Sequence, residues 1–441
     1  MTEENKISDK EEYFEEEKRP SKALLIGVYT HKDHKDTCVE HLEELERLTD
    51  TYGFITLEKV PIFLRKFEAS TFLTKGKMEE MQELAKSLDV NVVIFDDEIQ
   101  PSQQRNLEEV FERTVMDRTE VILEVFGQRA QTKEAQIQIK LAKVRYQFPR
   151  LKRLWTHLER QAGGGSGGVF LKGMGEKQIE IDRRLLNSEA RKLERALKEI
   201  KVHRETQRQD RVRTGIPTFA IVGYTNAGKS TLLNALTDAE VFVEDKLFAT
   251  LDTTTRKFTL PNKQDILLVD TVGFIRKLPH TLVAAFRSTL EEAVQTDVLL
   301  HLIDVSHPMV LEQVAATEEV LKELKASDKP IITVFNKIDK CENLAIIDRL
   351  RIKFPRTVQI SALKQEGFDD LMDLMVEELS KRREVVKIRV PQSQYDVVSE
   401  VMRKGRVINQ DYEENDVLMT VEMSSELKGR VEEYIIPSQP V

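Results

Sequence analysis

The segment GYTNAGKS at 223–230 constrains the fold more than any other part of the sequence. It follows an apolar strand pattern, TFAIV, and it begins a helix pattern, KSTLLNALT. Glycines at this spacing let backbone N–H groups turn toward phosphates, and the N-terminus of the following helix adds a partial positive charge. A strand, a phosphate loop and a helix in this order are typical of a P-loop domain. We therefore expect residues 216–384 to form an α/β domain with a mostly parallel, doubly wound sheet.

Three shorter sequence motifs follow the phosphate loop: DTVG at 270–273, NKID at 336–339 and SAL at 361–363. Each accompanies an apolar strand pattern. We call these three motifs and the phosphate loop the four words. Asp270 is placed to hold Mg²⁺ through water, and Gly273 can offer its N–H to a γ-phosphate. Asp339 can accept hydrogen bonds from the N1–H and N2–H₂ groups of guanine, a donor pair that adenine lacks. The SAL word would supply backbone contacts to the base oxygen. Together the four words predict an enzyme that binds GTP and GDP with Mg²⁺ and hydrolyses GTP.

Within these words, Lys229 should bridge the β- and γ-phosphates, and Ser230 should ligate Mg²⁺ directly. Lys229, Asp270 and Gly273 are the candidate catalytic residues. The candidate nucleotide-binding residues are those of the four words: Gly223, Tyr224, Thr225, Asn226, Ala227, Gly228, Lys229, Ser230, Asp270, Thr271, Val272, Gly273, Asn336, Lys337, Ile338, Asp339, Ser361, Ala362 and Leu363.

Two residues near the phosphates bear on finer points of the chemistry. Ras-type enzymes carry, after the Asp-x-x-Gly word, a Gln that orients the attacking water, whereas this chain has Phe274. A phenyl ring cannot orient water, so hydrolysis should be slow, or helped by another group or a partner. Asn226 inside the phosphate loop can support a monovalent cation such as K⁺, and the alternative is an Asn that only forms the turn.

The loop LFATLDTTTR at 247–256 lies between the phosphate loop and Asp270. A loop at this place must bring a hydroxyl group to Mg²⁺ when the γ-phosphate is present. The spacing allows Thr250, Thr253, Thr254 or Thr255 to supply that hydroxyl, and it does not choose among them.

Four further regions flank the P-loop domain. Residues 1–20 have the composition of a disordered acidic tail, and 21–128 alternate strand and helix patterns that predict a small α/β domain with a largely parallel sheet. That domain should contain strands at 23–29, 90–97 and 120–125 and helices at 41–53, 78–89 and 102–114, the last capped by Ser102. Residues 129–215 predict an antiparallel helical hairpin, kinked at Pro149, with a Gly-rich tip. Residues 385–441 predict a small α+β domain.

Composition and charge restrict the setting and the partners. No stretch reaches the roughly 18 consecutive apolar residues of a membrane helix. Two distant cysteines, Cys38 and Cys341, make no disulfide framework and fit a reducing cytoplasm. The net charge of −9 is uneven, because 1–18 carry eight acids and three bases whereas 150–213 carry 17 Lys and Arg against nine Asp and Glu. This asymmetry indicates one cationic face, and the alternative is a solvated charged helix.

The sequence resembles the HflX family of ribosome-associated GTPases, which is related to the Obg-like translation factors. The resemblance extends over nearly the whole chain from about residue 22. Its most specific parts lie outside the P-loop domain: TKGKMEEM (74–81), DDEIQPSQQRNLEEV (96–110), MDRTEVILEVFGQRAQTKEAQIQIKLA (116–142), FPRL (148–151) and GMGEKQIEIDRR (173–184).

The resemblance implies that Thr250 is the switch-one threonine on Mg²⁺ and acts in catalysis. It implies that the segment FATLD wraps the nucleotide through Phe248, Ala249, Thr250, Leu251 and Asp252. It also implies binding to the large ribosomal subunit by a protein similar to a splitting factor that rescues stalled or stress-damaged ribosomes. The Gly-rich tip, 163–175, would reach rRNA near the peptidyl-transferase centre, and the flanking basic helices would lie on rRNA. At that tip Phe170 and Met174 stand where family members commonly have Gly and Pro.

We therefore expect a cytoplasmic GTPase, monomeric in solution, that is slow alone and stimulated by ribosomes. No DNA partner is expected, and any membrane contact would be peripheral, without an anchor. One alternative is a GTP-regulated protein-interaction module that uses 129–215 as a coiled-coil arm. Another is ATP-driven RNA remodelling by the N-terminal α/β domain, which ranks last because no second phosphate loop precedes residue 217.

Overall fold

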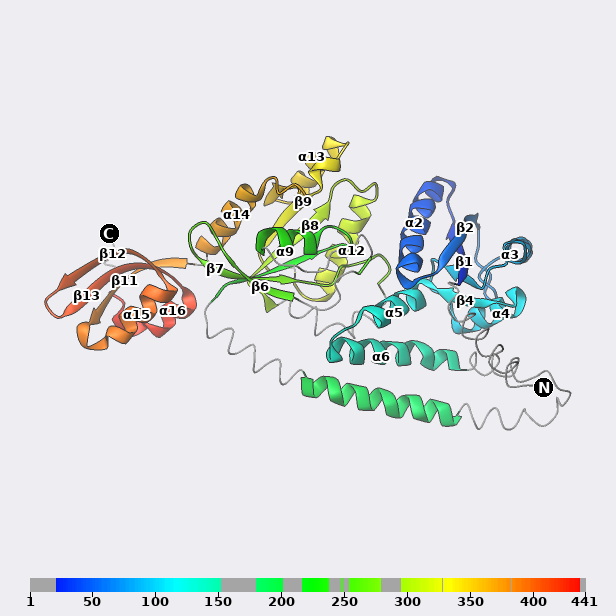
Figure 1. Cartoon of the computed structure of the whole chain (residues 1–441), viewed down its shortest axis with the longest axis horizontal. Coiled ribbons are helices and arrows are strands. Elements are labelled where there is room, and N and C mark those ends of the chain that lie inside the picture. Colours follow the sequence, from blue (N-terminus) through cyan, green and yellow to red (C-terminus); the bar gives the residue numbers. More distant parts are fainter. Residues whose placement is uncertain are drawn as a thin grey trace, which may run out of the picture. The chain divides into compact units, whose positions relative to one another are not determined.

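The computed structural model describes residues 21–151, 180–200, 216–237, 247–248, 254–278, 295–326, 328–381 and 383–436. These residues form two compact units (Figure 1). The first unit contains 21–151 and 180–199 together with 247–248 and 275–278, and the second contains residue 200, 216–237, 254–274 and the described residues from 295 onward. The boundary at Phe274 and Ile275 therefore falls within the chain of the predicted P-loop domain.

A four-stranded parallel sheet forms the centre of the first unit, in the order β2-β1-β3-β4. Its strands are β1 (Lys22–Tyr29), β2 (Ile55–Phe63), β3 (Val92–Phe95) and β4 (Thr114–Asp117). The helices around it are η1 (Lys32–His34), α2 (Lys35–Tyr52), α3 (Lys75–Ser87), α4 (Pro101–Phe111) and α5 (Arg118–Arg129). The predicted parallel α/β arrangement is confirmed here.

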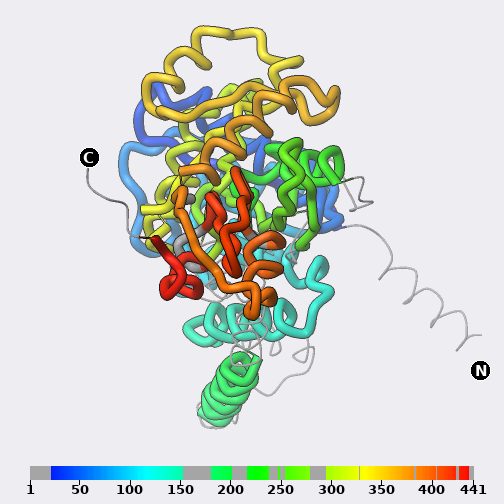
Figure 2. The backbone as a smooth tube through the Cα atoms, turned by 90° about the vertical axis from the view of Figure 1, so that its left-hand side faces the viewer, coloured from blue at the N-terminus to red at the C-terminus, as the bar shows by residue number. Residues whose placement is uncertain are grey.

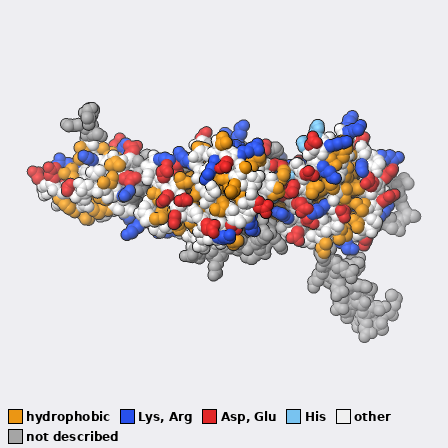
Figure 3. Space-filling view, turned by 90° about the horizontal axis from the view of Figure 1, so that it is seen from above, with side chains coloured by type: hydrophobic (Ala, Val, Ile, Leu, Met, Phe, Trp, Pro, Cys, Tyr) orange, Lys and Arg blue, Asp and Glu red, His pale blue; other side chains and the backbone are white. Residues whose placement is uncertain are grey.

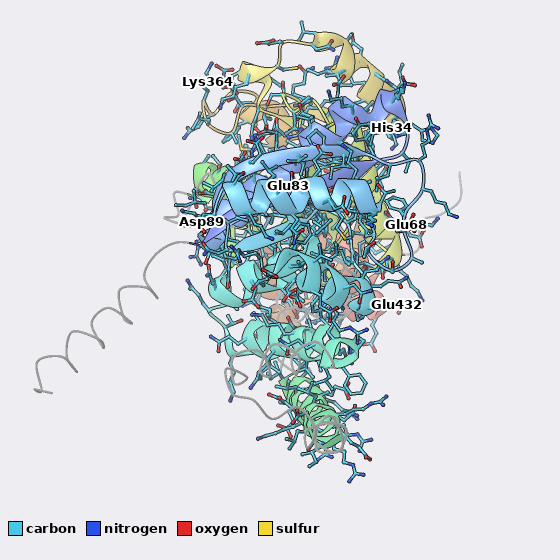
Figure 4. The ribbon with its side chains drawn as sticks, turned by 90° about the vertical axis from the view of Figure 1, so that its right-hand side faces the viewer. His34, Glu68, Glu83, Asp89, Lys364 and Glu432 are labelled. Atoms are coloured by element: carbon cyan, nitrogen blue, oxygen red, sulfur yellow. The ribbon has the colours of Figure 1, made fainter. Side chains whose placement is uncertain are left out.

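Strand β1 is buried on both faces, as expected for a parallel sheet covered by helices. Leu24 and Ile26 join the core that includes side chains of α3 and α4. On the opposite face, Gly27 approaches α2 so closely that a methyl group there would lie 2.8 Å from Cys38 Sγ. Figure 4 looks onto α3, with its exposed Glu83 toward the viewer.

Two local predictions in this unit need correction, and strands β2 and β4 were not predicted. The expected strand at 120–125 is wrong, because these residues form the interior of α5, whose first turn is capped by Asp117 accepting from the Glu120 N–H at 2.9 Å. Helix α4 is capped by Gln100 in a reciprocal capping box with Gln103, so Ser102 is not its cap. Strand β2 was not predicted, because its exposed and buried residues do not alternate regularly.

Helix α6 (Lys133–Gln147) continues into η2 (Phe148–Arg150), where Pro149 lies at the predicted kink. Residues 180–200 form a second helix, and the ion pairs Lys140–Glu189 and Arg145–Glu194 join it to α6 at 2.9 and 2.7 Å. Four apolar residues at helical spacing on this second helix, Leu186, Leu193, Leu197 and Ile200, are half-buried. The acidic tail and the Gly-rich tip lie outside the described residues.

A six-stranded sheet forms the centre of the second unit, in the order β10-β9-β8-β5-β7-β6, and all its pairs are parallel except β6 with β7. Its strands are β5 (Thr218–Gly223), β6 (Thr254–Thr259), β7 (Asp265–Asp270), β8 (Val298–Asp304), β9 (Ile331–Asn336) and β10 (Thr357–Gln359). Helices α9 (Lys229–Thr237) and α14 (Phe368–Ser380) supply the core on one face. Helices α12 (Val310–Glu323) and α13 (Leu344–Lys353) supply it on the other, which confirms the doubly wound, mostly parallel fold.

The C-terminal residues form a three-stranded antiparallel sheet in the order β11-β13-β12 (Figure 2). Its elements are β11 (Arg383–Pro391), η4 (Gln392–Gln394), α15 (Tyr395–Lys404), β12 (Arg406–Glu413), β13 (Asp416–Ser424), α16 (Ser425–Arg430) and η5 (Glu432–Tyr434). Val398, Val401 and Leu427 of the two helices pack on one face of the sheet. Across all the described residues, no helix has the length and apolarity needed to span a membrane.

Candidate nucleotide-binding site

The phosphate loop lies at the carboxyl end of β5, between β7 and β8 in the middle of the sheet. Gly223 has φ 153°, and a methyl group there would lie 2.3 Å from the Leu302 carbonyl oxygen of the neighbouring strand. Gly228 has φ 95°, and a methyl group there would lie 2.3 Å from Asn336 Nδ2. Both positions therefore require glycine, because the loop packs directly against two neighbouring segments.

Lys229 begins α9 and is buried at 7% exposure. Its ammonium group donates to the Tyr224 carbonyl oxygen at 2.8 Å, so the lysine lies back along the loop. Burial lowers the pKa of Lys229 to about 8, although the charge of Asp270 opposes this. A phosphate at this position would favour the charged lysine, since an opposite charge stabilises the ammonium form.

The two predicted magnesium groups lie together. Ser230 Oγ donates to Asp270 Oδ2 at 2.7 Å, and Asp270 is fully buried at the end of β7. Thr271 directs its hydroxyl to the Ile221 carbonyl oxygen at 2.7 Å, which fixes the chain beyond Asp270 to β5. A hydroxyl and a carboxylate side by side offer the oxygen donors that Mg²⁺ prefers.

The DTVG word is paired with the phosphate loop through the residue that follows it. The Phe274 N–H donates to the Gly223 carbonyl oxygen at 3.0 Å, and the Thr225 N–H donates to the Phe274 carbonyl oxygen at 2.7 Å. The Phe274 side chain is buried at 1% exposure. Phe274 therefore serves as a packing and pairing residue at the position where Ras-type enzymes have Gln.

Asn336 connects the phosphate loop to the SAL word. Its Nδ2 donates to the Ala227 carbonyl oxygen at 2.8 Å, and its Oδ1 accepts from the Ala362 N–H at 2.9 Å. The Ala362 N–H thus has a partner inside the protein. The predicted contact of the SAL word with the base oxygen stays a prediction.

The two base-recognition words are also brought together. Ser361 Oγ donates to Asp339 Oδ1 at 2.8 Å, which orients the carboxylate predicted to read guanine. Lys337 adopts the left-handed conformation, with φ 63°, and its ammonium group pairs with Asp304 at 2.7 Å. The structure thus gathers residues of all four words at one edge of one sheet.

The predicted switch-one residues are only partly covered. Ala249, Thr250, Leu251 and Asp252 lie outside the described residues, as does Thr253. Phe248 is described, and its ring packs edge-on against Phe126 of α5 with 4.4 Å between ring centres. Thr254 and Thr255 belong to β6, opposite Asp270 and Val269. Asn226 has φ 60°, a backbone conformation that Asn tolerates better than most residues, so its place in the turn has a structural reason.

Sequence reasoning missed a buried group of charged residues in the first unit: Glu44, Asp96, Arg118 and Arg276. Asp96 and Arg118 lie in two of the family-specific stretches and directly follow strands, which was the available signal. No local pattern indicated that Arg276, which follows the DTVG word, joins them.

A phosphate loop, an Asp-x-x-Gly word and an Asn-Lys-x-Asp word gathered at one edge of this sheet define a guanine-nucleotide-binding P-loop GTPase. Residues 39–127, 129–211 and 218–337 match the family models described as GTP-binding GTPase N-terminal, GTP-binding GTPase Middle Region and 50S ribosome-binding GTPase. The chain is 47% identical to the GTPase HflX of Chlamydia pneumoniae, over 95% of this chain and 89% of that protein. It is 42% identical to the GTPase HflX of Escherichia coli K12, over 84% of this chain and 85% of that protein. The chain belongs to the HflX family of GTPases.

Among solved structures, the chain is similar to a complex of SsGBP with GDP, with 25% identity, 81% of this chain and 98% of that chain covered, and a TM-score of 0.47. A GTP-binding protein from Sulfolobus solfataricus in complex with GDP gives 24% identity, 82% and 99% coverage, and a TM-score of 0.43.

Proposed function

We propose that this GTPase binds the large ribosomal subunit in its GTP form and leaves it after hydrolysis. The proposal rests mainly on one observation, the match of 218–337 to the family model described as 50S ribosome-binding GTPase. By the resemblance to HflX, the bound protein splits or rescues stalled ribosomes under stress. The Gly-rich tip would reach toward the peptidyl-transferase centre, and the working place would be the cytoplasm.

Charge distribution supports an RNA partner. Residues 150–213 carry 17 bases and nine acids, an excess of eight positive charges. In the helix formed by 180–200, Glu189 and Glu194 pair with α6, whereas Arg191, Lys192 and Arg195 are exposed. On the face drawn in Figure 3, by contrast, positive and negative side chains are interspersed over both units. Contacts with RNA phosphates need clustered cations, and residues 150–213 supply such a cluster.

The nucleotide cycle would use Mg²⁺, held by Ser230 directly, by Asp270 through water and, by the resemblance, by Thr250. Lys229 would neutralise charge on the β- and γ-phosphates, and the Gly273 N–H would contact the γ-phosphate. A K⁺ ion beside Asn226 could add further positive charge. Because Phe274 replaces a water-orienting Gln, large subunits should raise GTP turnover.

Co-sedimentation with purified large subunits tests the proposal. The wild-type protein should sediment with subunits in a non-hydrolysable GTP analogue and should be released in GDP. A double variant, Arg191→Glu with Lys192→Glu, should weaken binding. It should also make the negative slope of log affinity against log salt shallower, by about one per lost phosphate contact. The matched control, Arg349→Glu with Arg351→Glu on α13, reverses two exposed arginines outside the basic region and should bind normally.

Failure of the wild-type protein to bind subunits at low salt would refute the proposal. Normal subunit binding by the Arg191/Lys192 variant would show that this helix face does not contact rRNA. That result would favour the alternative, in which the same helix is an arm for a protein partner.

A further inference from the structure

The hydroxyl of Thr225, in the middle of the phosphate loop, is buried and has no hydrogen-bond partner among the residues that the structure describes. Two other buried threonines of the same unit bond to backbone oxygens, Thr271 to Ile221 at 2.7 Å and Thr317 to Gln313 at 2.9 Å. A buried hydroxyl without a partner destabilises a fold, so such groups are rare in native proteins. The exception at Thr225 therefore needs a physical reason.

The backbone around Thr225 fixes the place of this hydroxyl. The Thr225 N–H donates to the Phe274 carbonyl oxygen at 2.7 Å, and the Phe274 N–H donates to the Gly223 carbonyl oxygen at 3.0 Å. Threonine carries two heavy atoms on Cβ, so its side chain has few rotamers. The hydroxyl therefore stays where the phosphate loop meets the DTVG word.

Two residues of the predicted γ-phosphate site lie against Thr225. A methyl group on Gly273 would lie 2.7 Å from Thr225 Cγ2 and 2.9 Å from Lys229 Nζ, so the three residues meet around one point. Lys229 and Gly273 are the groups expected to contact the γ-phosphate. Thr225 thus borders the place proposed for the γ-phosphate, and the present inference rests on that part of the proposed function.

One small movement within the second unit brings the hydroxyl to the γ-phosphate. Lys229 Nζ lies back on the Tyr224 carbonyl oxygen at 2.8 Å, and Gly273 packs on Thr225. A γ-phosphate between Lys229 and Gly273 must separate Gly273 from the loop, and this uncovers the Thr225 hydroxyl. The hydroxyl then gains partners that GDP cannot offer. An interaction that strengthens in the transition state accelerates the reaction more than it tightens binding.

A hydroxyl has the hydrogen-bonding capacity that Phe274 lacks. It carries one donor and two acceptor sites, so it can accept from a water molecule while it donates to a γ-phosphate oxygen. We propose that Thr225 orients the attacking water and is a catalytic residue of GTP hydrolysis. The water oxygen bonds to the γ-phosphorus, and the bond between this phosphorus and the β-phosphate oxygen of the departing GDP breaks. One water proton passes to the released phosphate, and Thr225 keeps its own proton.

Single-turnover hydrolysis of GTP by the full chain alone, with enzyme in excess and Mg²⁺ present, tests the proposal. Thr225→Val keeps the branched shape and removes the hydroxyl, so the rate constant should fall about 10- to 100-fold. The Kd values for GDP and for a non-hydrolysable GTP analogue should each change less than about threefold, as expected for an interaction of the transition state. Thr225→Ser keeps the hydroxyl and should hydrolyse GTP within about threefold of the wild-type rate.

A role in packing alone would reverse the order of these two variants. Thr225→Val keeps the methyl group that faces Gly273, whereas Thr225→Ser removes it. The proposal is overturned if Thr225→Val hydrolyses GTP at the wild-type rate, if Thr225→Ser is as slow as Thr225→Val, or if Thr225→Val loses affinity for both nucleotides to the same extent as it loses rate.

Thr317→Val is the matched control, because it removes a buried hydroxyl that has a partner on α12, away from the phosphate loop. Its rate constant should equal that of wild type, and its melting temperature should fall. Thr225→Val should melt at or above the wild-type temperature, since it removes a buried hydroxyl without a partner. A melting temperature of Thr225→Val below that of Thr317→Val would overturn the proposal, because the hydroxyl would then stabilise the fold.

Co-sedimentation separates this proposal from ribosome binding. Thr225→Val should sediment with large subunits in the GTP analogue as the wild-type protein does. Failure of both proteins to sediment would refute ribosome binding, and slow hydrolysis by Thr225→Val alone would still support the role of Thr225.

Discussion

Asn336→Ala removes the side chain that joins the phosphate loop to the SAL word. Asn336 is buried at 2% exposure, and its amide makes hydrogen bonds of 2.8 Å to Ala227 and 2.9 Å from Ala362. Truncation leaves the Ala227 carbonyl and the Ala362 N–H without this partner. We expect the variant to lose both stability and nucleotide affinity, because the two ends of the nucleotide site are then no longer held to one another.

The size of the loss follows from the burial of the two orphaned groups. Ala227 and Ala362 are 0% and 3% exposed. Leaving one buried polar group unpaired costs about 1–3 kcal/mol, so two such groups should cost roughly 2–4 kcal/mol, given partial relaxation. A loss of this size corresponds to a weaker Kd for GDP by about 30- to 1000-fold if it falls on the bound state alone.

Isothermal titration with GDP and thermal unfolding followed by circular dichroism measure the two losses. The melting temperature should fall by about 4–12 °C. The matched control is Asn343→Ala, which removes only the cap of α13, where the side chain accepts from the Ala345 N–H at 3.2 Å. It should cost about 1 kcal/mol and leave GDP affinity unchanged. If Asn336→Ala bound GDP within threefold of wild type and melted at the same temperature, the reasoning would be refuted.

Three further predictions concern single residues. Asp339→Asn should weaken the binding of GDP and strengthen the binding of xanthosine diphosphate, because the amide can donate to the C2 carbonyl of xanthine. Competition titration of the two nucleotides would measure this change, and unchanged selectivity would contradict it. Gly273→Ala should abolish GTP turnover in a phosphate-release assay, since its methyl group would meet Thr225 at 2.7 Å, whereas GDP affinity should persist; normal turnover would disprove the packing argument. Burial lowers the pKa of His301 from 6.5 to about 4, so between these pH values the unfolded chain binds a proton at this residue and the folded chain does not. The free energy of unfolding should therefore fall by about 3 kcal/mol as the pH drops from 6.5 to 4. Acid melting curves should show this loss in wild type and lack it in His301→Gln.

Much of the second unit could be predicted from the sequence. Strands β5, β7, β8 and β9 are continuous apolar runs, and three of the four words begin at the last residue of β5, β7 or β9, so the fold carries these words to one edge of the sheet. The antiparallel edge strand β6 was not predicted, because its sequence TTRKFT is polar and half-exposed.

The first unit was harder to predict from local patterns. The segment EVILEV at 120–125 is rich in β-branched residues, which predicts a strand. It lies in α5 instead, where Val121, Ile122 and Val125 are all buried. Helix propensity and strand propensity differ by less than the free energy of burying such side chains, so tertiary packing decided the outcome. Gln100 caps α4 in place of Ser102 for a local reason, a reciprocal pair of hydrogen bonds with Gln103.

The sequence by itself determined the guanine-nucleotide chemistry, because the phosphate loop, the carboxylate at the end of β7 and the base-reading words are short and contiguous. Only the tertiary structure decided which residues support them. Asn336 reaches a loop 109 residues away, and Arg276 meets a carboxylate 180 residues away. Contacts of such separation depend on how strands are ordered and on which side chains are desolvated together. Neither property is written in the spacing of residues along the chain.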